Sequence, residues 1–178
     1  MKKLYNEYCK SYKLNENNDD GFFDTVKEIY FSDEVQSLRQ YEQHLEIDRL
    51  QHITTVAYLS YKICKKLDLD HKSAALAAVM HDLVYYDWRD GETGGWHRLH
   101  GYKHPNYACL NAKELYPELS EKEDNIIRRH MWPLTIIPPK YKEGLVVTFA
   151  DKYCATIEVY YSVNKKFRDN FNRMVKEL

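Results

Sequence analysis

The sequence lacks the long apolar run that a membrane span or an export signal requires. Its amino terminus reads MKKLYNEYCK, in which charged and polar residues occur throughout. An excess of one charge is also missing, because 26 Lys and Arg residues are balanced by 27 Asp and Glu residues, for a formal net charge of -1. A chain without a basic excess has no general attraction for nucleic acid. We therefore expect a cytoplasmic protein that binds neither membranes nor nucleic acid.

Closely spaced cysteine pairs are absent as well. Four cysteines are widely separated and form no CxxC motif, which argues against a zinc knuckle and against a redox dithiol. We expect reduced and mostly buried thiols. The length of 178 residues suits one domain with a single core.

The sequence also shows no strand alternation, no internal repeat and no low-complexity tract. Apolar residues instead recur at spacings of three and four, which predicts an all-α helical bundle. We expect one domain over residues 1–178, with short flanking helices in 1–47, a core in 48–164 and a C-terminal helix in 165–178. The polar stretch NENNDDG separates the first flanking helix from a second segment, 22–46, which is interrupted near Ser32 and Asp33.

Helix boundaries in the core follow from capping signals. Asp70 is a suitable N-cap for a helix that runs to Val84 or Tyr86. Pro105 suits the first turn of another helix and would place His104 at its amino end. Ser120 and Glu123 form a capping box before a helix that reaches about residue 130. The prolines of residues 132–139 exclude a helix there, and a long helix is expected over 141–163.

Two carboxylates stand out because their surroundings are apolar. The stretch AALAAVMHDLVYYDW places His81 and Asp82 at the end of an almost entirely apolar helix, and LVVTFADKYCATIE places Asp151 inside another. A buried carboxylate costs several kcal/mol unless it is paired or binds a cation. Carboxylates and imidazoles from different helices remove this cost when they converge on a metal ion.

The order of these residues resembles that of the HD superfamily of metal-dependent phosphohydrolases. The likeness spans about residues 49–158 and includes a histidine early in a helix, an HD pair after an alanine-rich helix and a late ADK motif. It implies a metal site formed by His52, His81, Asp82 and Asp151. His104 and His130 resemble the additional histidines of two-metal members, in which the HD aspartate bridges both ions.

The resemblance also implies cofactors and roles. We expect two divalent ions, with Fe or Mn favoured and Zn, Co, Ni or Mg as alternatives, because a histidine-rich site suits transition metals better than Mg. Asp82 would set the spacing of the ions. Arg89 and Lys152 are the candidates for clamping phosphate or protonating the leaving group. The substrate-binding candidates are Arg89, Lys103, His100 and Trp132.

Other interpretations of single histidines stay open. His97 and His100 lie in the same glycine-rich segment as His104, and either could be the ligand in its place. His52 alone could be a core histidine with a hydrogen-bond partner, and His130 could simply interact with the dipole at a helix C-terminus.

The expected substrate is a small phosphorylated molecule, such as a nucleotide. One alternative is an HD-type diiron oxygenase, and another is a nucleotide-sensing module with a retained metal site. The extra histidines also resemble the branch that hydrolyses diadenosine tetraphosphate, although the lysine of that branch after the HD pair is missing from LVYYD. No GYP motif follows the HD pair, and the chain is shorter than alarmone hydrolases. The sequence leaves a homodimer open.

Overall fold

The computed structural model describes residues 2–15, 17–44, 47–87 and 100–177. Most of them are helical, which confirms the all-α prediction. The elements are, in chain order, α1 (Lys2–Ser11), α2 (Phe22–Tyr30), α3 (Asp33–Gln36), the 3-10 helix η1 (Ser37–Gln40), β1 (Glu42–His44), β2 (Ile47–Asp48), α4 (Arg49–Lys66), α5 (His71–Met80), α6 (His100–Leu115), α7 (Glu121–Arg129), α8 (Lys142–Val163) and α9 (Lys165–Glu177).

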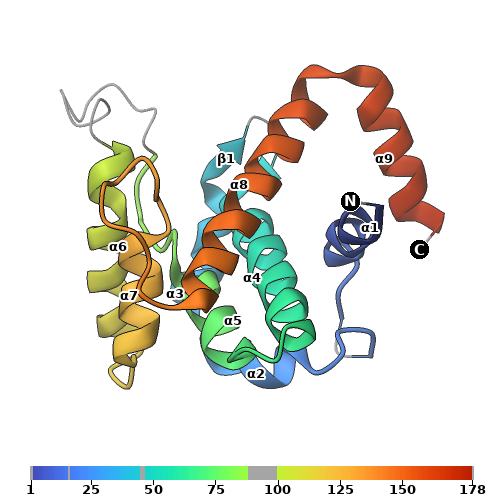
Figure 1. Ribbon diagram of the computed structural model, residues 1–178. Helices are drawn as coiled ribbons and strands as arrows, with labels where there is room; N and C mark the ends of the chain where they lie inside the picture. Colours follow the sequence, from blue (N-terminus) through green and yellow to red (C-terminus); the bar gives the residue numbers. More distant parts are fainter. Residues whose placement is uncertain (1, 16, 45–46, 88–99, 178) are drawn as a thin grey trace.

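The helices α4, α5 and α8 form the centre of the bundle. The helix α4 packs against both α5 and α8, while α6 and α7 lie together on one side and α1 and α9 on the other (Figure 1). Residues 52–61 of α4 are buried without interruption, so apolar neighbours surround this helix on all sides. Any charged side chain that points from α4, α5 or α8 toward the centre therefore leaves water.

Side-chain caps fix where the central helices begin. Asp48 accepts a hydrogen bond from the backbone N–H of Gln51, and Asp70 accepts one from Ser73, as the sequence predicts for Asp70. The predicted capping box of Ser120 at the start of α7 is also present. These caps set the position along each helix at which the histidines occur.

The helix α5 ends earlier than we expect from its apolar pattern. It stops at Met80 instead of continuing to Val84 or Tyr86. The Nδ1 atom of His81 donates to the carbonyl of Ala78 at 2.7 Å, and a continuing helix would need this carbonyl for the N–H of Asp82. The histidine side chain thus takes over a backbone hydrogen bond and helps to end the helix.

The predicted start of the helix that contains Pro105 is wrong. The helix α6 begins at His100, so Pro105 lies in its second turn and His104 is the fifth residue instead of the amino end. A proline there removes only the hydrogen bond to the carbonyl of Gly101. The helix therefore continues through it.

A short antiparallel hairpin was not predicted. The strands β1 and β2 pair Glu42 with Asp48 and His44 with Ile47. Two or three residues are too few for an alternating pattern to stand out in the sequence. The hairpin matters for the site because it presents Gln43 to the centre of the bundle.

Two other properties of the described residues agree with the sequence. All four cysteines are buried and free. None of the helices in the described ranges is both long and apolar enough to cross a membrane.

Candidate metal centre

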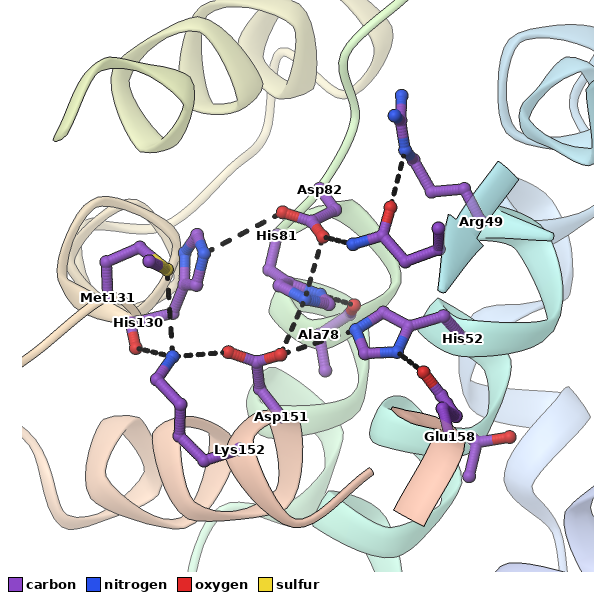
Figure 2. A network of polar contacts seen from close by, with 12 residues as sticks. Arg49, His52, Ala78, His81, Asp82, His130, Met131, Asp151, Lys152 and Glu158 are labelled. Atoms are coloured by element: carbon purple, nitrogen blue, oxygen red, sulfur yellow. Dashed lines mark hydrogen bonds and ion pairs between the residues drawn. The ribbon is translucent and has the colours of Figure 1, made fainter. Parts of the chain in front are cut away.

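Six acidic and imidazole side chains meet at the centre of the bundle, and all of them except His104 are labelled in Figure 2. All six are buried, with at most 7% of any residue exposed. They come from five helices or the residues that follow them: His52 from α4, His81 and Asp82 after α5, His104 from α6, His130 after α7 and Asp151 from α8. The structure therefore brings together every residue that the resemblance assigns to metal.

One group of donors consists of His52, His81 and Asp151. The Oδ1 atom of Asp151 lies 3.3 Å from Nε2 of His52 and 3.9 Å from Nε2 of His81. All three donor atoms lie within 4.8 Å of one another. Donors at such distances can share one ion.

A second group lies beside the first and shares His81 with it. It includes Asp82 and His130, and Nε2 of His104 is 2.9 Å from Nε2 of His130. The two oxygens of Asp82 face different histidines, since Oδ1 lies 3.1 Å from His104 and Oδ2 lies 3.6 Å from His81. Asp82 thus faces His104 of the second group with one oxygen and His81, which both groups share, with the other, so this carboxylate could bridge two ions.

The lone pairs at this centre fit a cation. His81 and His130 donate through Nδ1 to the carbonyls of Ala78 and Ile127, which leaves Nε2 of each ring as the nitrogen that can bind a cation. Nε2 of His81 has no hydrogen-bond partner among the described residues, although it is buried. Metal–nitrogen bonds of roughly 2.0–2.1 Å place adjacent donors of one ion about 3–3.5 Å apart, close to the separations found here.

The electrostatics favour charged carboxylates and one neutral imidazole. Burial alone raises the pKa of Asp82, but the surrounding imidazoles hold it well below its usual range. Burial, together with the neighbouring histidines His81 and His104, lowers the pKa of His130 to about 3. Burial also lowers the pKa of His52, yet the carboxylates of Glu158 and Asp151 outweigh this effect and raise it well above its usual value. A negative centre lined by nitrogen donors attracts divalent ions.

A comparison with protein-family models identifies the family of the chain. The HD domain model matches residues 49–156, which is more than half of the chain. The protein belongs to the HD family. The match supports a metal-dependent hydrolase superfamily in general and does not show the diadenosine tetraphosphate branch. No curated protein and no solved structure matches the chain.

The carboxylate of Asp82 is oriented by a side-chain amide that lies outside the residues matched by the HD model. Gln43 on β1 donates from Nε2 to Oδ2 of Asp82 at 2.8 Å, and its own carbonyl accepts from Nε of Arg49 at 2.9 Å. Arg49 is only 1% exposed and also donates to the carbonyls of Val84 and Tyr86, which follow the HD pair. Sequence reasoning missed both Gln43 and Arg49, because neither lies in a motif and the contact depends on the hairpin.

Lys152 lies at the edge of this HD centre. Its ammonium donates to Oδ2 of Asp151 at 2.7 Å and to the carbonyl of His130 at 3.4 Å, while 42% of the side chain stays exposed. Lys152 therefore orients the second oxygen of Asp151 and can also reach solvent.

The structure describes only some of the remaining candidates. Lys103 is half-buried on α6, and Trp132, two residues after His130, is 36% exposed. His100 begins α6, but its side chain is outside the description. Arg89 and His97 lie outside the described residues. The roles of all five stay predictions.

We expect Arg49→Met to lower the free energy of unfolding by about 3 kcal/mol, since it removes the buried donor that Gln43 and two backbone carbonyls share. Urea denaturation measures this change. The exposed Arg39 on η1 provides the control, and Arg39→Met should stay within about 0.5 kcal/mol of the wild type. Equal effects of the two substitutions would contradict the role of Arg49.

Proposed function

We propose that the protein is a phosphohydrolase that removes phosphate from a phosphomonoester or phosphoanhydride, with a nucleotide or another small metabolite as substrate. The observation that supports this proposal most is the position of Asp82 between two groups of donors. Two ions about 3.5–4 Å apart on a shared carboxylate are the usual arrangement for phosphate displacement.

His52, His81 and Asp151 would hold one ion, and His104 and His130 the other, with Asp82 shared. When bound, divalent ions of this kind lower the pKa of a coordinated water and neutralise charge on the phosphoryl group. The imidazole-rich donor set suits Fe or Mn, with Zn, Co, Ni or Mg as alternatives. The shared carboxylate would set the distance between the two ions.

The chain's own residues would bind and orient the substrate. Lys152 is a cation at the partly exposed edge of the centre, where its ammonium can attract a phosphate oxygen. Arg89, Lys103, His100 and Trp132 remain the other candidates for substrate contacts. The deep burial of the histidines excludes bulk water from the donors, which strengthens electrostatic interactions there.

Phosphate release tests this proposal directly. Protein purified without chelators is analysed for its metal content and then assayed against nucleotides and sugar phosphates. We expect about two transition-metal ions per chain and release of phosphate from at least one nucleotide or sugar phosphate. Oxygen consumption with an organic substrate and no phosphate release would favour the diiron oxygenase instead. Nucleotide binding without turnover would favour a sensing module.

Asp82→Ala should abolish both metal retention and turnover, because it removes the carboxylate shared by the two groups. Metal content by elemental analysis and phosphate release are both measured. Asp169→Ala on the exposed face of α9 is the matched control and should change neither. Full activity of Asp82→Ala would reject the hydrolase proposal.

His104→Ala should reduce the metal content by about one ion per chain and leave the other ion in place, since His104 lies against Asp82 and His130 of the second group. His71→Ala replaces a histidine at the start of α5, away from the centre, and serves as the control. An unchanged metal content in His104→Ala would assign the ligand to His100 or indicate a single ion.

A further inference from the structure

Glu158 is a buried carboxylate that neither the HD motif nor the proposed donor groups include. It lies two helical turns after Asp151 on α8, so both side chains point to the same face of that helix. The HD match ends at Thr156, just before it. Its exposure is 0%, and its Oε2 atom lies 2.8 Å from Nδ1 of His52, whose exposure is also 0% (Figure 2).

His81 and His130 are oriented differently from His52. His81 and His130 each follow the end of a helix, where the last carbonyls have no partner within the helix. Their Nδ1 atoms donate to the carbonyls of Ala78 and Ile127. These two histidines therefore obtain their orienting acceptor from their own helix.

His52 cannot be oriented like this, because it lies inside α4. It is the fourth residue of that helix, and the carbonyls one turn before it are used by the helix itself. An acceptor for its Nδ1–H has to come from another helix. Glu158 provides it across the packed contact between α4 and α8.

A carboxylate differs from a carbonyl in that it carries a full negative charge. A hydrogen bond from Nδ1–H to a carboxylate fixes the ring tautomer and makes Nε2 a stronger donor. The Nε2 atom of His52 lies toward Asp151 at 3.3 Å, on the side of the first donor group. The charge of Glu158 also acts on an ion at this group through a medium from which water is excluded.

We propose that Glu158 is a positioning residue that orients His52 and strengthens its bond to the ion of the first group. This inference rests on the proposed metal site. It predicts that loss of the Glu158 charge weakens one ion more than the other, because Glu158 lies behind a histidine of the first group. A merely structural Glu158 would instead affect folding without selecting either ion.

Metal retention in competition with a chelator tests the proposal on the full chain loaded with Co²⁺. Glu158→Gln keeps the size of the side chain and removes its charge. We expect it to weaken retention of one of the two ions about 10- to 100-fold, as loss of a partner behind a ligand histidine usually does, and to change the visible absorption of that ion. The other ion should be retained as in the wild type.

Glu143→Gln is the matched control. Glu143 is a second buried carboxylate on α8, but it accepts from the backbone N–H of Asp70 and pairs with Lys122 at the far end of the helix. Its substitution should leave Co²⁺ retention within about twofold of the wild type. Equal loss of metal in Glu143→Gln and Glu158→Gln, or wild-type retention in Glu158→Gln, would overturn the positioning role.

Glu158→Asp separates charge from packing and replaces Glu158→Gln if that variant does not fold. It retains the charge but shortens the side chain, so it should hold the affected ion better than Glu158→Gln and less well than the wild type. Wild-type retention in Glu158→Asp, or weaker retention than in Glu158→Gln, would contradict a role through charge and orientation. A wild-type chain that retains no ion would reject the metal site itself.

Discussion

The structure depends on the burial of negative charge among imidazoles at the centre of a helical bundle. Asp82 and Asp151 are both 7% exposed, and Glu158 is not exposed at all. Carboxylates removed from water destabilise a fold strongly unless hydrogen bonds and cations compensate. The helices that supply these residues could pack more simply around apolar side chains. The buried carboxylates therefore indicate that this centre binds cations.

Two histidines of the centre also shape the helices that carry them. The rings of His81 and His130 each donate a hydrogen bond to a backbone carbonyl at the end of the preceding helix, where the helix itself provides no partner. This one bond contributes to ending the helix and fixes which nitrogen faces the centre. Local structure and the chemistry of the site are therefore set by the same atoms.

Much of this could be predicted from the sequence, because the information lies in short stretches. The apolar helix before His81, the capping box at Ser120 and the all-α class are all local patterns, and the structure agrees with them. The resemblance to the HD superfamily, which the family match confirms, supplied the set of candidate ligands. The end of α5 was placed wrongly because apolar residues continue past a hydrogen bond that only the fold reveals.

The residues behind the ligands could not be predicted in this way. Gln43 reaches Asp82 only because the short hairpin of β1 and β2 turns it inward, and Glu158 reaches His52 only because α8 packs against α4. Polar residues such as these look ordinary in a sequence, and their partners lie 39 and 106 positions away.

The balance of charge around the centre links these contacts to the proposed chemistry. Asp82, Asp151 and Glu158 are three buried carboxylates, and the cations that face them are Arg49, Lys152 and His52, whose pKa Glu158 and Asp151 raise. Two divalent ions would leave the centre positive. A positive centre beside the exposed ammonium of Lys152 attracts an anionic phosphate, whereas the same centre with its carboxylates alone would repel it. In the proposed phosphohydrolase, substrate binding and metal binding would therefore be coupled through the same buried carboxylates.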